Sequence, residues 1–386
     1  AGRRRLVAPM PPSLRTSLAG IPLECAVYNA SGPKSGHVSD LVNVGHSRAG
    51  AVLSKSATLV KQSGNPLPRL RQIALGKGLA QGSINSEGLP NAGIDYYISQ
   101  TVLDGVAQTG KPYIVSLSGL KMEDNVEMLG RIASAAAASP GKIKAVELNL
   151  ACPNIPGKPT VALDFDQMAS VLKLVLEHQG FADSGLPLGI KLAPYFDGPH
   201  FDQAAEIINA HAGRIAYVVT MNTIGNCLTI DTETESATIA PKGGFGGLAG
   251  GFAKHIALAN VAQLYKRLDR SIDIVGVGGV ASGEDAFQLI LCGAKAVQIA
   301  TTHWLEGPGC FDRIAGELSA IMERKGYSSI EEFCGKLKPY DKNNKPKEPK
   351  SIDTDDRAPL PTWVMISMPI LIIISTLLGF LLMGKK

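Results

Sequence analysis

Eight short apolar runs, separated by segments of helical periodicity, constrain the fold more than any other feature of this chain. Helix-like segments such as EDNVEMLGRIASAAAA and GEDAFQLILCGA lie between them. Strands that alternate with helices indicate βα units and a parallel sheet. Eight such units predict an α/β fold of the (β/α)8 or TIM barrel type. The predicted strands are 26–29, 51–55, 112–117, 145–150, 188–192, 215–220, 272–276 and 296–300.

Polar residues and glycines follow these runs at their carboxyl ends. In a (β/α)8 barrel the active site is built there, from the loops after the strands. Any one of these residues could be a solvated loop residue, but together they predict a site on one face. They are Asn29 to Gly32, Lys55 and Ser56, Ser116 and Ser118, Asn149 with Cys152 and Asn154, Lys191, Asn222 and Thr223, Gly278 and Gly279, and Thr301 and Thr302.

The last two of these loops indicate a phosphate site. GVGGV (276–280) and IATTHW (299–304) follow the seventh and eighth runs, which is the usual phosphate position of such barrels. Glycine lets backbone N–H groups approach an anion closely. Together with GFGGLAGG (244–251), these loops favour a phosphorylated cofactor such as flavin mononucleotide (FMN). The chain contains neither a P-loop nor a dinucleotide-binding glycine motif.

The two ends of the chain differ from its body. Residues 1–22 are Arg-rich and free of acids, which fits either a transit-peptide remnant or a frayed basic tail. Residues 339–361 form a charged, proline-rich linker between the barrel at 23–338 and the C-terminal segment. Segment 362–383 carries no charge and is long enough for a transmembrane helix. We therefore expect a C-terminal membrane anchor and a cytoplasmic catalytic body. Association with mitochondria is the alternative.

Charge and cysteine usage exclude some functions. The net charge is only +4, with the basic excess near the ends, so the body offers no nucleic-acid groove. None of the six cysteines forms a C-x-x-C pair, and no histidine pair stands at ligand spacing near them. We expect free thiols in a reduced compartment and no metal site.

Several motifs, in order from about Leu23 to Lys338, resemble a known family. They are NASGP, SKSATLVKQSGNPLPR, GSINSEGLPN, ELNLACPNIPGKP, GIKLAPYFD, NTIGN, GGFGGLAGG, GVGGVASGEDAF and CGAKAVQIATT. This set is similar to dihydroorotate dehydrogenase of the fumarate-dependent class 1A. LNLACPNIPGKP and GNPLPR separate this class from the membrane class, which uses a serine base.

The resemblance implies a homodimer that binds FMN and oxidises dihydroorotate to orotate in pyrimidine biosynthesis, with fumarate as electron acceptor. It implies substrate binding by Lys55, Asn85, Ser86, Gly88, Leu89, Asn149, Asn154, Asn222 and Thr223. It implies FMN binding by Ala30, Ser31, Lys55, Ser56, Asn149, Lys191, Met221, Gly251, Gly278, Gly279, Ala300 and Thr301.

Three residues receive catalytic roles from the resemblance: Cys152, Lys55 and Lys191. Cys152 would take the proton from C5 of dihydroorotate while C6 gives hydride to the flavin. A thiol titrates near ~8.5, close enough to neutrality for a general base once a lysine or amide dipoles lower its pKa. Lys191 would stabilise charge on the reduced flavin. The alternatives without a catalytic role are a buried structural thiol at Cys152 and, at Lys191, a lysine at the barrel rim whose ammonium reaches solvent.

This chain departs from the family pattern at three positions. Glu87 stands where methionine is usual, and a carboxylate there would cost affinity for an anionic substrate unless it points to water. Thr223 replaces serine and Cys227 replaces glycine. Alternative functions are a flavin barrel acting on another pyrimidine, a quinone-dependent enzyme, and a scaffold without turnover.

Overall fold

The computed structural model describes residues 11–74, 81–151 and 160–343. The chain divides into two compact units, Ala1–Leu337 and Lys338–Lys386, close to the predicted end of the barrel domain. The first unit contains all the helices and strands of the described residues.

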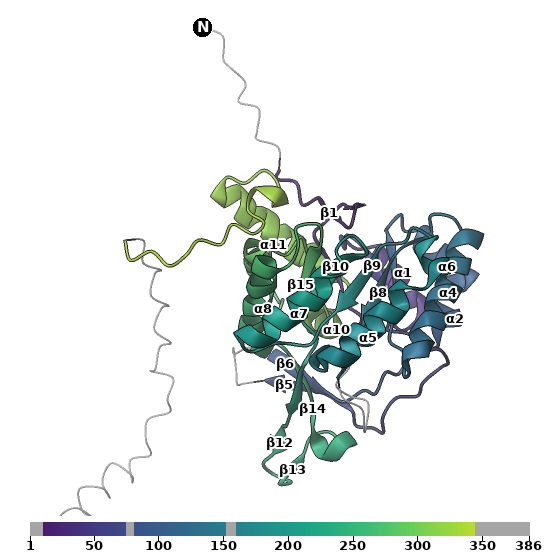
Figure 1. Ribbon diagram of the computed structural model, residues 1–386. Helices are drawn as coiled ribbons and strands as arrows, with labels where there is room; N and C mark the ends of the chain where they lie inside the picture. The colour runs from purple at the N-terminus through teal and green to yellow at the C-terminus, as the bar shows by residue number, and fades with distance from the viewer. Residues whose placement is uncertain (1–10, 75–80, 152–159, 344–386) are drawn as a thin grey trace, which may run out of the picture. The chain divides into compact units, whose positions relative to one another are not determined.

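A parallel eight-stranded barrel forms the centre of this unit (Figure 1). Neighbouring strands pair in the order β3, β16, β15, β10, β9, β8, β7, β4. The two outer members are joined by the backbone N–H of Gly50, which donates to Val27 at 2.8 Å, and by the Asn29 side chain, which bonds to Leu53. The strands are β3 (Val27–Asn29), β4 (Val52–Leu53), β7 (Tyr113–Leu117), β8 (Ile143–Asn149), β9 (Leu188–Lys191), β10 (Ile215–Thr220), β15 (Asp273–Val277) and β16 (Ala296–Ile299).

Each of these strands overlaps one of the eight predicted runs, so the prediction of a (β/α)8 barrel is confirmed. The runs are rich in Val, Ile and Leu because parallel strands in a barrel are buried on both faces. Strands β4, β7 and β9 are buried at every position.

Helices surround the barrel and pack on it through apolar faces. Helix α9 shows how the sequence sets a boundary, since the Ser282 hydroxyl accepts from the Asp285 N–H and the Asp285 carboxylate accepts in return from Ser282. The helices are α1 (Val38–Gly45), α2 (Ile94–Tyr97), α3 (Gln100–Ala107), α4 (Met122–Ala138), α5 (Phe165–Leu176), α6 (Gln179–Ala182), α7 (Gly198–Asn209), α8 (Lys254–Arg267), α9 (Gly283–Cys292), α10 (Thr301–Glu306) and α11 (Gly309–Lys325).

A second sheet, which the sequence did not predict, lies at the carboxyl end of the barrel (Figure 1). It is antiparallel, in the order β11 (Ile224–Cys227), β14 (Gly246–Gly250), β6 (Gln81–Asn85) and β5 (Leu70–Ala74). An exposed hairpin of β12 (Ile230–Asp231) and β13 (Ser236–Ala237) extends from the connection between β11 and β14.

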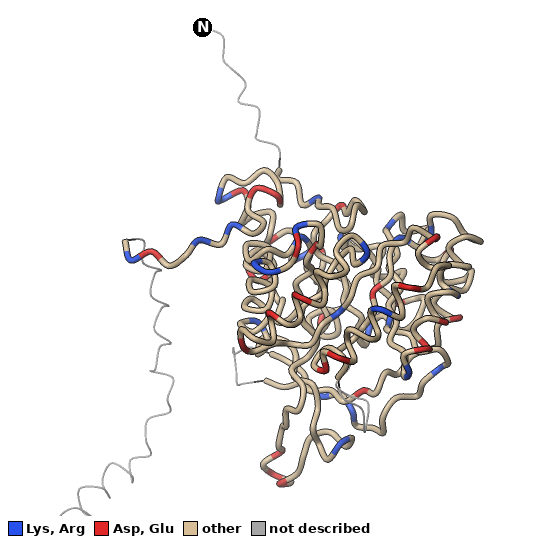
Figure 2. Tube along the Cα trace, in the orientation of Figure 1, with Lys and Arg blue, Asp and Glu red and all other residues tan. Residues whose placement is uncertain are grey.

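The opposite end of the barrel carries the hairpin of β1 (Thr16–Leu18) and β2 (Ile21–Leu23). Leu18 and Leu23 are buried in the main core, and Ser13 pairs with Ser329. Residues 13–22, predicted as part of a separate basic segment, are therefore built into the folded unit. Lysines and arginines are interspersed with acidic residues over this unit (Figure 2).

The prediction of a membrane-anchored localisation needs correction. Within residues 11–74, 81–151 and 160–343, no helix is both long and apolar enough to cross a membrane. The helix predicted at 362–383 lies outside the described residues. The predicted anchoring is therefore wrong for the part of the chain that the structure describes.

Candidate active site

A cavity of about 820 Å³ lies where the carboxyl ends of the barrel strands meet the second sheet. Most of the strand-end residues that the sequence predicted line it, whereas Asn29, Ser116 and Ser118 do not. Its lining includes Ala30, Ser31, Lys55, Ser56, Asn85, Gly88, Leu89, Asn149, Lys191, Met221, Asn222, Thr223, Gly251, Gly278, Gly279, Ala300 and Thr301.

Three further predicted site residues, assigned to substrate binding or catalysis, are not placed in this lining. Ser86 is fully buried beside it, and its hydroxyl has no hydrogen-bond partner among the described residues. Cys152 and Asn154 lie outside the described residues. The loop quoted as LNLACPNIPGKP is thus described only as far as Ala151.

A chain of amides and hydroxyls crosses the floor of the cavity. Asn222 Nδ2 donates to Asn149 Oδ1 at 3.2 Å, and Asn149 Nδ2 donates to Ser56 Oγ at 3.3 Å. Ser56 Oγ lies 2.9 Å from Ser116 Oγ and 3.0 Å from Ser31 Oγ. These bonds fix the orientation of both asparagine amides, so each presents a defined donor or acceptor to a ligand.

Lys191 at the end of β9 is buried, and a carboxyl group lies in the barrel near it. Burial lowers the pKa of the Lys191 ammonium, the Glu147 carboxylate opposes that shift, and Lys55 adds to it. Burial also raises the pKa of Glu147, which accepts a 2.6 Å hydrogen bond from Gln298 Nε2. The second oxygen of Glu147 has no partner among the described residues. A lysine at this position supplies positive charge to whatever occupies the cavity above it.

Lys55 at the end of β4 makes a second lysine–carboxylate pair, and this one lies in the cavity wall. Its Nζ is 2.8 Å from Glu87 Oε2. The two side chains are 9% and 18% exposed. The Glu87 carboxylate therefore points to a lysine of the site and not to water.

Two glycines after β15 provide close backbone approach. Gly278 and Gly279 have φ values of +133° and +73°, which favour glycine. A Cβ at Gly278 would lie 2.9 Å from that of Ala257, and one at Gly279 would lie 2.6 Å from that of Lys254. Only glycine fits there, so the backbone of this loop borders the cavity directly.

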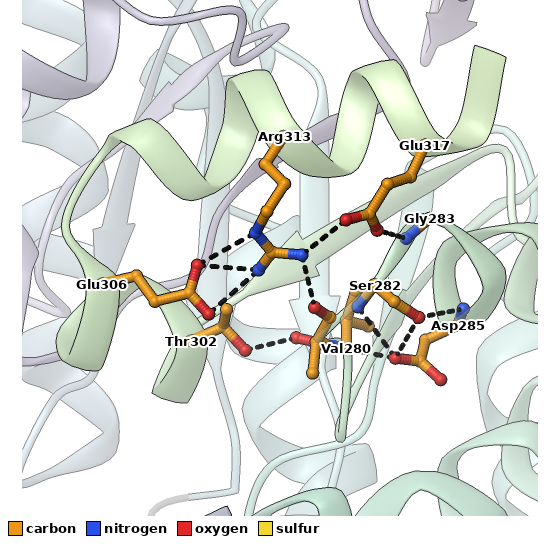
Figure 3. Close-up of polar contacts among 9 residues, drawn as sticks. Val280, Ser282, Gly283, Asp285, Thr302, Glu306, Arg313 and Glu317 are labelled. Atoms are coloured by element: carbon orange, nitrogen blue, oxygen red, sulfur yellow. Dashed lines mark hydrogen bonds and ion pairs between the residues drawn. The ribbon is translucent and has the colours of Figure 1, made fainter. Parts of the chain in front are cut away.

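The same loop is braced from outside by Arg313 of α11 (Figure 3). Arg313 pairs with Glu306 at 2.7 Å and Glu317 at 2.9 Å, and donates to the Ala281 carbonyl at 3.0 Å. Glu317 in turn accepts from the backbone N–H of Gly283 at 2.7 Å. One guanidinium thus ties α10, α11 and the glycine loop together.

On the cavity side of this loop, Thr302 Oγ1 donates to the Val280 carbonyl at 2.6 Å. Lys254 Nζ pairs with Asp285 at 2.5 Å. Burial raises the pKa of Asp285, but hydrogen bonds from Lys254, Ala281 and Ser282 outweigh it, so the net pKa is lowered. The loop between β15 and α9 is held from both sides.

The described cysteines are free thiols. Burial raises the pKa of Cys25, Cys227 and Cys292, and raises that of Cys310 to about 12 and Cys334 to about 11. A thiol that stays protonated at neutral pH is a poor base. None of these five is placed to act as one.

Sequence reasoning missed the residues that the second sheet adds to the cavity. GFGGLAGG, interpreted as a loop, contains strand β14, because Gly82 and Gly250 let two backbones approach where a Cβ on either would clash. Strand β6 (QGSIN) is buried at its three central positions, although only one of these residues, Ile84, is apolar. The second sheet adds Leu70, Gln72, Gln81, Ser83 and Leu248 to the lining. Other lining residues that were not predicted are His255 of α8, Gln298 of β16 and Trp304 of α10.

Comparisons with known proteins agree with this geometry. Residues 13–322 match the family model described as dihydroorotate dehydrogenase. The chain is 44% identical over 326 residues to dihydroorotate dehydrogenase A (fumarate) of Lactococcus lactis subsp. lactis, covering 84% of this chain and 99% of that protein. It is 44% identical over 329 residues to dihydroorotate dehydrogenase (fumarate) of Saccharomyces cerevisiae, covering 85% and 99%.

A solved structure shares the fold. It is the crystal structure of DHODH in complex with ferulenol from Eimeria tenella, with a TM-score of 0.66, 21% identity, and coverage of 83% of this chain and 88% of that one. The predicted resemblance to the fumarate-dependent class is confirmed by the identities above. The chain belongs to the dihydroorotate dehydrogenase family.

Proposed function

We propose that this chain oxidises dihydroorotate to orotate, as a step of pyrimidine biosynthesis, with fumarate as the electron acceptor. The observation that carries the proposal is the convergence of Lys55, Asn149, Lys191 and Asn222 on one cavity in a chain 44% identical to enzymes named for this reaction. Dihydroorotate loses one proton and one hydride, and fumarate gains both as it becomes succinate.

We propose FMN as the cofactor that this cavity binds. Dihydroorotate dehydrogenases are flavoproteins. The Gly278–Gly279 backbone, with no room for a Cβ, suits a phosphate, and buried Lys191 suits the ring system that takes up negative charge. When bound, FMN supplies the acceptor for the hydride that leaves C6. Ala30, Ser31, Ser56, Met221, Gly251, Ala300 and Thr301 complete the proposed FMN contacts.

The ring of the substrate would be held by the asparagine amides, and its carboxylate by Lys55. Dihydroorotate carries one carboxylate and several ring N–H and C=O groups, and each asparagine can both donate and accept. The Thr223 hydroxyl is buried and has no partner among the described residues, so it is available to a ligand. Asn85, Ser86, Gly88, Leu89 and Asn154 complete the proposed substrate contacts.

Cys152 is the proposed base that removes the C5 proton. The five cysteines that the structure describes all have raised pKa values, so none of them competes for this role. Cys152→Ser should slow flavin reduction by orders of magnitude at neutral pH while FMN remains bound. Cys227→Ser is the matched control and should reduce its flavin at the wild-type rate. Equal rates in wild type and Cys152→Ser would remove this thiol from the mechanism.

A direct test of the proposed function combines cofactor identity with turnover. Heat-released flavin should be FMN, and orotate should form from dihydroorotate faster with fumarate than with a soluble quinone. Turnover with the quinone alone would contradict the proposed acceptor. A colourless protein that forms no orotate would contradict the enzyme assignment itself.

A homodimer remains a proposal carried by the family resemblance. It is supported by apolar side chains exposed around the β12–β13 hairpin: Leu228 is 42%, Ile230 61% and Phe245 38% exposed. Exposed apolar clusters favour association. Sedimentation should give the mass of two chains, and Ile230→Asp should shift it toward one.

A further inference from the structure

The pairing of Glu87 with Lys55 introduces an acid into the cavity wall of this chain. The two groups are 2.8 Å apart and largely shielded from water. Both residues line the cavity, and Lys55 has no other carboxylate partner among the described residues. The ion pair therefore lies within the cavity wall, and it occupies the Lys55 ammonium.

The backbone holds Glu87 in this position. Its carbonyl accepts from the Asn65 N–H at 2.8 Å, and the N–H of the preceding Ser86 donates to the Arg69 carbonyl at 2.8 Å. The next two residues, Gly88 and Leu89, have φ values of +67° and +56°, so the backbone after Glu87 is left-handed at two successive positions. Rotation of the Glu87 side chain away from Lys55 breaks none of these backbone hydrogen bonds.

The charges around the pair explain what it does to an anion. Lys55 lies near enough to Lys191 to lower the pKa of that lysine, so the two cations repel each other. Lys191 is balanced by Glu147 inside the barrel, and Lys55 is balanced by Glu87 in the cavity wall. A carboxylate ligand that binds Lys55 must therefore replace Glu87 or share the lysine with it. It also meets a like charge until Glu87 rotates away.

We propose that Glu87 is a specificity-determining residue that competes with the substrate carboxylate for Lys55. This inference rests on the proposed function, which places the carboxylate of dihydroorotate at Lys55. Glu87 weakens the binding of every carboxylate ligand at that lysine. It leaves the binding of a neutral ring almost unchanged, since such a ring does not require the Lys55 ammonium.

The test uses holoprotein and two ligands that share a ring. Orotate carries the carboxylate and uracil lacks it, and both dissociation constants can be measured from the perturbation of the flavin spectrum. Glu87→Gln should tighten orotate binding about 10-fold or more. It should change uracil binding by less than about twofold, and Glu87→Met should act in the same direction. Glu177→Gln, at an exposed position after α5, is the control and should change neither constant.

The outcomes separate this inference from the proposed function. An unchanged ratio of orotate to uracil affinity in Glu87→Gln and Glu87→Met overturns the competition, even if the wild type oxidises dihydroorotate. Equal gains for both ligands also overturn it, because they would show a steric effect. Failure of every variant to bind orotate, with flavin present, would overturn the proposed function as well.

Discussion

Asn29 bonds to the backbone of Leu53 twice across the seam between β3 and β4. Its Nδ2 donates to the Leu53 carbonyl at 2.7 Å, and its Oδ1 accepts from the Leu53 N–H at 2.9 Å. Both residues are fully buried. One side-chain amide thus replaces a backbone pair between the two strands at which the barrel closes.

Asn29→Ala should destabilise the fold strongly, because a buried N–H and a buried C=O both lose their partner. We expect a loss of about 2–4 kcal/mol in the free energy of unfolding. Asn209→Ala is the matched control, since Asn209 also bonds twice to backbone, at Arg267 and Asp269, but from a half-buried position at the end of α7. Urea unfolding at a fixed FMN concentration measures the loss in the free energy of unfolding for both variants. A loss at Asn29 no larger than that at Asn209 would contradict a role in barrel closure.

His303 in α10 should make the fold sensitive to acid. Burial lowers its pKa to about 4, from about 6.5 in an unfolded chain, with smaller effects from Asp40 and Lys34. Between these values the unfolded state binds more protons, so stability falls as pH drops from ~6.5 to ~4, by about 3 kcal/mol at most. His303→Gln should flatten this part of the curve of unfolding free energy against pH. An unchanged slope would rule out His303 as its source.

Arg313→Ala should weaken FMN binding without touching the cavity. The variant frees the Ala281 carbonyl and two carboxylates that brace the glycine loop. Because the Arg313 side chain is 39% exposed, we expect a modest rise of about 3- to 10-fold in the FMN dissociation constant. Arg131→Ala, which breaks pairs with Asp95 of α2 and Glu127 of α4, should leave FMN affinity unchanged. Equal effects of the two variants would show that the brace does not act on the cofactor.

Lys191→Met should lower the reduction potential of the bound flavin. The variant removes a buried positive charge from the cavity floor, so it disfavours the more negative reduced state. We expect a fall of roughly 30 mV or more, which corresponds to about 1.4 kcal/mol for two electrons. Lys144→Met, at an exposed position of β8, is the control. Equal flavin reduction potentials in the two variants would show that Lys191 does not stabilise the reduced flavin.

The barrel could be predicted well from the sequence, because the hydrophobic periodicity and the composition of a segment reflect how it is buried. Strands such as β9 and β16 are wholly buried, so their apolar runs stand out. Strand ends must meet on one face, which is why Lys55, Asn149 and Lys191 could be grouped from the sequence alone.

The remaining features depend on contacts between distant segments. Glu147 and Gln298 lie inside the apolar runs AVELNL and AVQIA, and nothing local shows that they bond to each other. The second sheet pairs β6 with β14, more than 150 residues apart, and its glycines resemble loop residues. The partner of Glu87 could not be known from its own motif, because Lys55 comes from another strand end.

Anaerobic mixing of the holoprotein with dihydroorotate tests the proposed function most directly. If the chain is a dihydroorotate dehydrogenase, the flavin absorbance bleaches, one orotate forms per flavin, and later addition of fumarate restores the oxidised spectrum. A flavin that stays oxidised in excess dihydroorotate, with no orotate formed, would contradict this function.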